Sequence, residues 1–298
     1  DLIEERAVKA AKEYGVPGAK VYTDYKELLA DPEIDVVHVC TPNRSHADIS
    51  IDAMHAGKHV MCEKPMAKSA ADARRMVAAA KETGKKLTIG YQHRHKAEAQ
   101  YVKKVIERGD LGDMYYAEAF AVRRRGTPNW GVFLNEYEQG GGPLIDIGTH
   151  SLDLTLYLLN NYKPRMAVGT TYKKLTNPDQ ANPWGPWDEK QHTMEDAAFG
   201  FIVMENGATI ILKATWALNT CEPVPEGSVM ICGSKAGAQI KNGVTINKDE
   251  FGRLVDIHPD MKAGGVAFYD GVAETAPITE QRRWYEALYN DTDPVVLP

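Results

Sequence analysis

The sequence predicts an α/β protein in which a doubly wound parallel sheet is followed by an α+β domain with a large, mostly antiparallel open sheet. Up to residue 93, short apolar runs alternate with helical patterns of about ten to fifteen residues, as in βαβ units. Beyond that point strand-like runs dominate and helices are few. A chain of 298 residues is also too long for one ordinary core, so we expect two domains, 1–93 and 94–298.

The first half predicts helices and strands in alternation. Residues 3–14 form a helix that ends at Gly15, and residues 25–29 form a second, short helix. Residues 35–40 are continuously apolar, which is typical of a strand buried on both faces of a parallel sheet. The elements that follow are helix 47–56, strand 59–62, helix 70–83 with Ser69 as its N-cap, and strand 86–90.

The second half predicts a sheet with few helices. A helix over 96–108 comes first, and Asn206-Gly207 is a strong hairpin turn between two later strands. Two further helices are expected over 146–159 and 279–290. The expected strands are 114–122, 165–172, 197–204, 208–216 and 228–232.

Composition narrows the class of protein. Hydrophobic residues make up 43% and charged residues 26%, as in a soluble globular protein. A net charge of −6 argues against a nucleic-acid binder, and no apolar stretch reaches the ~18 residues of a membrane span. Four cysteines without a Cys-x-x-Cys pair indicate buried thiols in a reducing compartment, so we expect a cytoplasmic protein.

Polar loops follow three of the predicted parallel strands. They are Thr41-Pro42-Asn43, Glu63-Lys64-Pro65 and Tyr91-Gln92-His93-Arg94. Any one of them is ordinary turn chemistry. Because ligands bind outside the carboxyl ends of strands in open α/β sheets, the three together predict one ligand site.

Lys64, Asp146 and His150 are the expected catalytic residues. A lysine, a carboxylate and an imidazole in one cleft can bind a hydroxyl, take its proton and hold the resulting charge without a metal. In this interpretation His150 is the base, and Lys64 donates to the developing oxyanion. Asp146 lies one helical turn before His150, so both side chains share a face and Asp146 binds a second hydroxyl or orients the imidazole.

The motifs resemble, in order, the signatures of the Gfo/Idh/MocA oxidoreductases, the relatives of glucose-fructose oxidoreductase and inositol dehydrogenase. The resemblance runs from Asp1 to about Cys232. It implies a Rossmann domain, a C-terminal α+β domain, NAD(P), and oxidation or reduction of a sugar, cyclitol or glycoside hydroxyl. The motifs that carry it are Thr41-Pro42-Asn43 with His46, Ala56-Gly57-Lys58-His59-Val60, Glu63-Lys64-Pro65, Gly90-Tyr91-Gln92-His93-Arg94 and Asp146-Ile147-Gly148-Thr149-His150.

One departure concerns the start of the family pattern. The first strand and its Gly-x-Gly-x-x-Gly turn have no counterpart, so we expect the sequence to be part of a longer chain. Asp1 then resembles the acid that binds the adenosine ribose, which favours NAD over NADP. Asp is equally common as a helix N-cap.

The resemblance also assigns cofactor-binding residues. They are Asp1, Thr41, Pro42, Asn43, His46, Glu63, Lys64, Gln92 and Arg94.

The candidate substrate contacts are one arginine and three tryptophans: Arg123, Trp130, Trp184 and Trp187. Arg123 also fits a solvated strand edge, and the tryptophans also fit a core.

Other functions stay open at this point. One is a metal-dependent lyase or hydrolase that uses Asp146, His150 and Asp153 as ligands. The others are a redox glycosidase that retains NAD and a non-catalytic NAD-binding protein. Few helices are available to cover the second sheet, so we expect a homodimer or homotetramer that forms through it.

Overall fold

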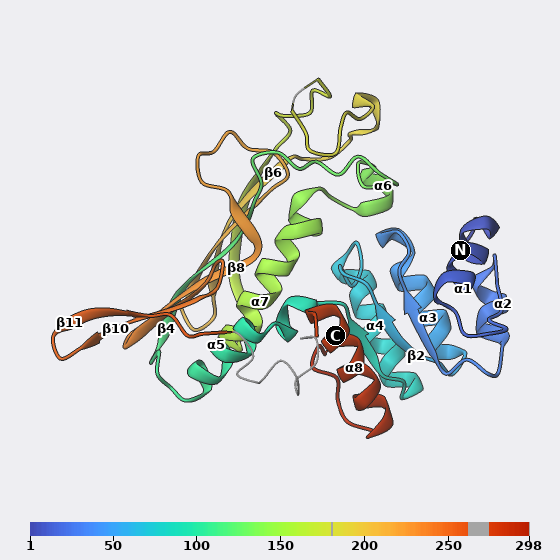
Figure 1. The fold of residues 1–298 in the computed structure, drawn as a ribbon, viewed down its shortest axis with the longest axis horizontal. Coiled ribbons are helices and arrows are strands. Elements are labelled where there is room, and N and C mark those ends of the chain that lie inside the picture. Colours follow the sequence, from blue (N-terminus) through green and yellow to red (C-terminus); the bar gives the residue numbers. More distant parts are fainter. Residues whose placement is uncertain (180, 262–273, 298) are drawn as a thin grey trace. The chain divides into compact units, whose positions relative to one another are not determined.

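The computed structural model describes residues 1–179, 181–261 and 274–297 (Figure 1). These residues divide into two compact units, one made of residues 1–90 with 287–297 and the other of the described residues between 91 and 286. None of the described helices is both long and apolar enough to cross a membrane.

The first unit holds a three-stranded parallel sheet in the order β1-β2-β3. The predicted parallel sheet is therefore confirmed, and so is the helix cap at Ser69, whose hydroxyl accepts a hydrogen bond from Asp72 N at 3.1 Å. The strands are β1 (Val36–Val39), β2 (His59–Cys62) and β3 (Leu87–Ile89), and the helices are α1 (Glu4–Tyr14), α2 (Tyr25–Ala30), α3 (His46–His55) and α4 (Ala70–Thr83).

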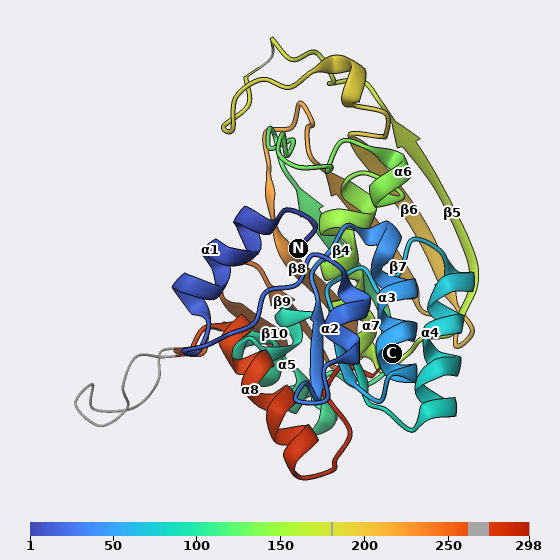
Figure 2. The ribbon, with the colours of Figure 1, turned by 90° about the vertical axis from the view of Figure 1, so that its right-hand side faces the viewer.

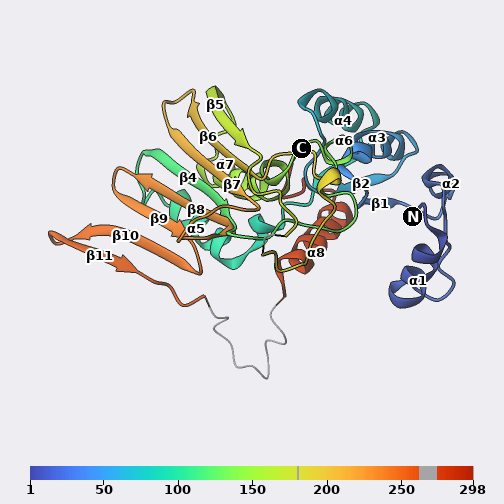
Figure 3. The same ribbon diagram turned by 90° about the horizontal axis from the view of Figure 1, so that it is seen from above.

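The second unit is built on an eight-stranded sheet in the order β11-β10-β9-β8-β4-β7-β6-β5 (Figure 3). β4 and β7 run parallel, and the other neighbouring strands are antiparallel, as predicted. The strands are β4 (Met114–Val122), β5 (Pro164–Tyr172), β6 (Ala197–Met204), β7 (Thr209–Thr215), β8 (Val224–Gly233), β9 (Ala236–Ile240), β10 (Val244–Glu250) and β11 (Arg253–Ile257).

Helix α7 (Thr149–Leu159) packs against the middle of this sheet. Leu154 and Leu158 are fully buried over β4, where Ala117 and Ala119 present small side chains that let the helix approach closely. The remaining helical segments of the unit are η2 (Gln92–His95), α5 (Ala97–Glu107), α6 (Glu136–Gln139), η3 (Leu144–Gly148), η4 (Glu189–Gln191) and α8 (Ala276–Tyr289), whose last residues belong to the first unit.

One end of the sheet is open to solvent. β5 is the outer strand, with β6 on its inner side (Figure 2), and every residue of β5 is exposed. Val168 and Phe201 lie opposite each other on neighbouring strands, and 61% and 38% of their surfaces are accessible. The described residues thus leave an apolar surface at this edge.

Two differences from the sequence-based prediction concern this sheet. Strands β9 to β11 were not expected, because β9 is rich in alanine and glycine and β10 ends in charged residues. Arg123, which also fitted a solvated strand edge, lies just beyond the strand, since β4 ends at Val122. The predicted hairpin is confirmed, since Asn206-Gly207 turns between β6 and β7 and Gly207 has a φ of +88°.

Candidate active site

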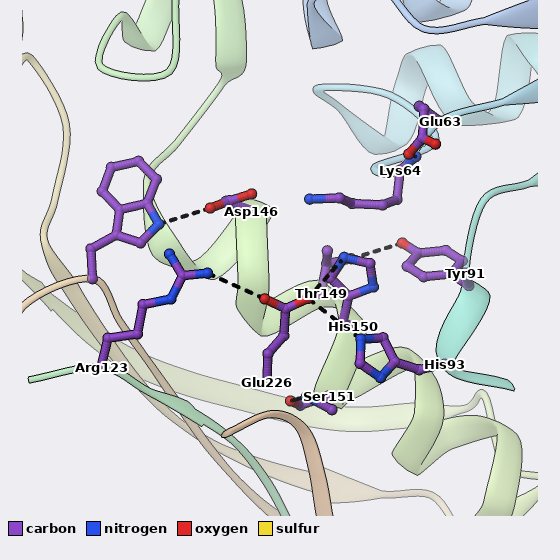
Figure 4. Close-up of polar contacts among 12 residues, drawn as sticks. Glu63, Lys64, Tyr91, His93, Arg123, Asp146, Thr149, His150, Ser151 and Glu226 are labelled. Carbon is purple, nitrogen blue, oxygen red and sulfur yellow. Dashed lines mark hydrogen bonds and ion pairs between the residues drawn. The ribbon is translucent and has the colours of Figure 1, made fainter. Parts of the chain in front are cut away.

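The second unit brings several predicted site residues together in space. Figure 4 shows Asp146 in η3 and His150 in α7, with His93 from η2 and Glu226 from β8 beside the His150 imidazole. The start of α7 is held close to the sheet at Gly148, where a Cβ atom would lie only 2.7 Å from the Cβ of Ala214. A glycine at this position therefore sets how near the helix comes to β7.

Asp146 lies in a π-helical turn rather than in the regular helix that the sequence predicts. The segment Leu144–Gly148 is π-helical, and α7 begins only at Thr149. The Asp146 carboxylate accepts a hydrogen bond at 2.8 Å from the indole N–H of Trp216, which is completely buried. This bond fixes the carboxylate orientation.

The segment before the π-helix is anchored by Glu195. Its carboxylate accepts a hydrogen bond of 2.8 Å from Gly142 N. Burial raises the pKa of Glu195, while the backbone hydrogen bonds to the carboxylate oppose that shift. Gly142 must be a glycine here, since a Cβ atom would lie 2.2 Å from Glu195 O.

His150 is buried within a cluster of polar and aromatic side chains. Its Nε2 lies 3.4 Å from Glu226 Oε1, and the Nε2 of His93 lies at the same distance from the same oxygen. The two imidazole centroids are 4.9 Å apart, and the Tyr91 ring meets His150 edge-on at 6.1 Å. A carboxylate at this position orients the imidazole and stabilises its positive charge when it accepts a proton.

Glu226 is in turn held by Arg123, whose Nη2 lies 3.4 Å from Glu226 Oε2. The Arg123 guanidinium also lies over the Trp184 ring, 5.5 Å from its centroid. Arg123 therefore faces the cluster rather than a solvated strand edge. Arg125 instead donates to Asn219, at 2.8 Å.

The tryptophans separate into two groups. Trp130 and Trp184 form an edge-to-face pair with centroids 4.9 Å apart, and both are partly exposed. Trp187 packs against the buried cluster that contains Trp216, and its indole donates to Thr176 O at 3.1 Å. Trp130 and Trp184 are thus available to a ligand, whereas Trp187 is largely engaged with the core.

Arg94 is a buried ion-pair partner. Its guanidinium donates two hydrogen bonds to the two oxygens of Asp153, at 2.8 and 2.5 Å. Both side chains are buried, and Arg94 also lies over the Tyr157 ring. The Asp153 carboxylate is therefore occupied by an arginine, which disfavours the metal set of Asp146, His150 and Asp153. Gln92 lies beside Arg94 at the start of η2.

The remaining predicted site residues lie in the first unit. Thr41, Pro42 and Asn43 follow β1, and Glu63 and Lys64 follow β2, so both loops leave the carboxyl edge of the sheet. His46 is fully buried, and its ring nitrogens lie 2.8 Å from Thr41 O and Pro65 O. His46 therefore ties these two loops together.

Asp1 and Glu63 make local contacts in the same unit. The Asp1 carboxylate accepts a hydrogen bond from Ile3 N at 2.9 Å, while the N-cap of α1 is Ile3. A Cβ atom at Gly90 would lie 3.3 Å from Glu63 Oε2, so β3 passes close to that carboxylate.

His93 and Glu226 are the functional candidates that the sequence did not reveal. His93 lies within a recognised motif, yet nothing in its spacing predicts contact with His150. Glu226 lies 76 positions after His150 on a different element. The one local signal is the Gly227 that follows it, which adopts a φ of +74°.

Comparison with known proteins gives the family context. Residues 1–91 match the model of the oxidoreductase family with an NAD-binding Rossmann fold, and residues 99–239 match the GFO/IDH/MocA C-terminal domain. The chain is 39% identical over 238 residues to D-glucoside 3-dehydrogenase of Escherichia coli. The aligned region covers 79% of this chain and 66% of that protein. It is 36% identical over 168 residues to 1,5-anhydro-D-fructose reductase of Ensifer adhaerens. That alignment covers 56% of this chain and 50% of that protein.

A solved structure resembles nearly the whole chain. It is the aldose-aldose oxidoreductase from Caulobacter crescentus complexed with glycerol, with a TM-score of 0.76 and 25% sequence identity. The match covers 99% of this chain and 81% of that one. The chain thus spans between half and two thirds of the two curated relatives named above.

Proposed function

Because this chain belongs to the Gfo/Idh/MocA oxidoreductase family, we propose that it is an NAD-dependent dehydrogenase acting on a hydroxyl of a sugar, cyclitol or glycoside. The observation that carries the proposal is the placement of the buried His150. Its imidazole lies between the Glu226 carboxylate and the Tyr91 ring, on the helix that begins just after the turn containing Asp146. The similarity to D-glucoside 3-dehydrogenase over most of this chain supports a sugar or glycoside as the substrate class.

In the proposed reaction His150 accepts the hydroxyl proton while the carbon loses a hydride. The Glu226 carboxylate stabilises the imidazolium that results. Lys64 donates to the oxygen on which charge develops, and Asp146, oriented by Trp216, binds a neighbouring hydroxyl. Trp130 and Trp184 are proposed to stack on the sugar or its aglycone.

The first unit fits a dinucleotide. It has a parallel sheet whose carboxyl edge carries Thr41, Pro42, Asn43 and Glu63, and His46 holds the two loops that contain them. We assign residues 1–93 to cofactor binding and residues 94–298 to substrate binding and assembly. Bound NAD supplies the hydride acceptor, and Asp1 favours NAD over NADP because it would repel a 2′-phosphate.

The experiment follows NADH absorbance while inositols, aldoses and glycosides are offered with NAD. We expect NADH formation with at least one of them, and a loss of about 10²–10⁴-fold in kcat for His150→Asn. Lys64→Met should also lower kcat. His55→Asn and Lys81→Met are the matched controls, since both side chains are exposed, on α3 and α4.

One result would contradict the proposed activity, and another would contradict only the role of His150. If no member of the panel reduces NAD, the proposed activity is wrong. If His150→Asn turns over at the wild-type rate, the dehydrogenase assignment stands but the base is another group.

Assembly and location complete the proposal. We propose a homodimer or homotetramer that forms through the exposed β5–β6 edge, where Val168 and Phe201 present apolar surface. The four cysteines form no disulfide, which fits a reducing compartment and supports a cytoplasmic location.

A further inference from the structure

We propose that His93, His150 and Glu226 form a binding site for a divalent cation of the zinc class. One ligand atom from each of the three residues lies within 4.8 Å of the other two, and the Nε2 nitrogens of both histidines face the Oε1 oxygen of Glu226. They come from η2, α7 and β8, and Figure 4 shows the three side chains pointing toward a common point. Both imidazoles are buried, with 6% and 2% of their surfaces exposed.

The distances suit a cation better than a direct contact. The Nε2 nitrogens of His93 and His150 each lie 3.4 Å from Glu226 Oε1, which is beyond the ~2.7–3.2 Å of a good N–H···O hydrogen bond. Neighbouring ligands of a tetrahedral zinc with bonds of ~2.0–2.1 Å lie about 3.3–3.4 Å apart. A pair at the 4.8 Å limit would need to close by about 1.4 Å to complete such a shell.

The donor set is also chemically specific. Two histidines and one glutamate are the protein ligands of a zinc site that keeps a fourth position open. Neutral imidazoles suit zinc and its first-row neighbours, while calcium and magnesium prefer oxygen donors throughout. The site should therefore bind zinc or cobalt far more tightly than magnesium.

The residues that follow Glu226 and His150 hydrogen-bond to each other and so fix the backbone that carries these two ligands. Gly227, next to Glu226, donates its N–H to the hydroxyl of Ser151, next to His150, at 3.0 Å. Ser151 in turn donates to Phe120 O at 2.8 Å, which fixes both to the end of β4. β8 and α7 are thus joined directly beside the two ligands.

Gly227 also lets the third ligand, His93, lie close to the backbone of β8. Gly227 has a φ of +74°, and a Cβ atom there would lie 2.2 Å from Nδ1 of His93. Only a glycine lets the backbone pass this close to the imidazole. Arg123, at 3.4 Å from the second carboxylate oxygen, holds Glu226 with one oxygen directed at the histidines.

This site goes beyond the proposed dehydrogenase, which needs no metal. A cation on His150 Nε2 would occupy that nitrogen and prevent it from accepting a proton. The cation-bound and proton-accepting states of that atom are therefore mutually exclusive, which makes the site a means to switch the enzyme off.

The test is cobalt titration of chelator-treated protein, without NAD or sugar. We expect visible absorption bands of tetrahedral Co²⁺ that saturate at one equivalent and disappear when Zn²⁺ is added. His93→Asn and Glu226→Gln should each weaken Co²⁺ binding by at least about tenfold. His192→Asn, a buried histidine outside the cluster, is the control, and circular dichroism checks that each variant is folded.

Two results would overturn the site. One is the absence of Co²⁺ bands from folded wild-type protein. The other is equal Co²⁺ affinity in the wild type and in the folded Glu226→Gln variant, whose partly exposed side chain makes folding least sensitive to the change. Since neither cofactor nor substrate is present, the outcome is independent of the dehydrogenase assay.

Discussion

Trp216 donates its indole N–H to Asp146 at 2.8 Å, so a fully buried side chain at the end of β7 holds the carboxylate proposed to bind substrate. Trp216→Phe keeps most of the packing and removes the donor. We expect the free energy of unfolding to fall by about 1–3 kcal/mol and kcat to fall roughly ten- to hundredfold.

Trp187→Phe is the matched control for that variant, because its indole donates to Thr176 O instead. It should leave kcat nearly unchanged. A Trp216→Phe enzyme with the wild-type kcat would show that the indole only fills the core.

The buried pair of Arg94 and Asp153 should be critical for stability. Arg94→Met leaves an uncompensated carboxylate in the interior, which costs about 3–5 kcal/mol. The double variant Arg94→Met/Asp153→Leu should recover most of this loss, as measured by urea unfolding. Arg75→Met, which removes an exposed ion pair with Asp48, should have little effect. If the double variant folds but does not regain the lost free energy of unfolding, Arg94 stabilises the protein through other contacts.

The stability of the fold should decrease in acid because two histidines are buried. Burial lowers the pKa of His95 to about 4, helped by the charges of Arg283 and Arg94, and it lowers that of His192 to about 4, helped by Lys173. In the unfolded chain both titrate near 6.5, so between about 6.5 and 4 the unfolded chain binds protons that the folded chain does not. Stability is therefore fully present above this window and is lost as the pH falls through it, by up to about 1.4 kcal/mol per pH unit for each histidine.

Urea unfolding at several pH values between 8 and 4.5 measures this slope. His192→Phe, which fits between Trp187 and Trp216, should make the slope shallower. Replacement of the exposed His55 should not. An unchanged slope in His192→Phe would assign the acid sensitivity to other groups.

Self-association should depend on the exposed edge of the second sheet. Phe201→Lys places a charge opposite Val168 on the outer strands and should shift the mass measured by light scattering toward the monomer. Phe251→Lys is the control, since Phe251 is 98% exposed at the β10–β11 turn. A wild-type protein that is monomeric at micromolar concentration would refute assembly through this edge.

Cofactor preference should follow Asp1. Calorimetry on the whole protein should show tighter binding of NAD than of NADP, and Asp1→Ser should narrow the difference because the repulsion of the 2′-phosphate is removed. Equal affinities in the wild type would leave Asp1 with only its local hydrogen bond to Ile3 N.

The sequence predicted the elements whose stability is local. Strands such as β4 and β7 are rich in apolar residues, α4 has its capping serine, and the β6–β7 hairpin has Asn206-Gly207. Each of these signals acts within a few residues, so a single chain displays it.

The relationships that cross the chain could not be predicted in this way. Asp146 was expected in a regular helix, yet packing of Gly148 on Ala214 accompanies a π-helical turn there. The convergence of His93, His150 and Glu226 depends on how η2, α7 and β8 meet, which no spacing along the chain reveals. The meeting of Lys64 with Asp146 and His150 remains a prediction.

The first unit also contains residues from both the beginning and the end of the described chain. Thr88 donates its hydroxyl to Val296 O at 2.9 Å across 208 positions, and Lys86 pairs with Asp291 at 3.0 Å. At about 5–20 residues per second, a ribosome would need roughly 10–40 s to synthesise the intervening segment. The sheet β1-β2-β3 is therefore translated first, but the Thr88 hydroxyl on β3 gains its acceptor on Val296 only after the whole second unit has been translated.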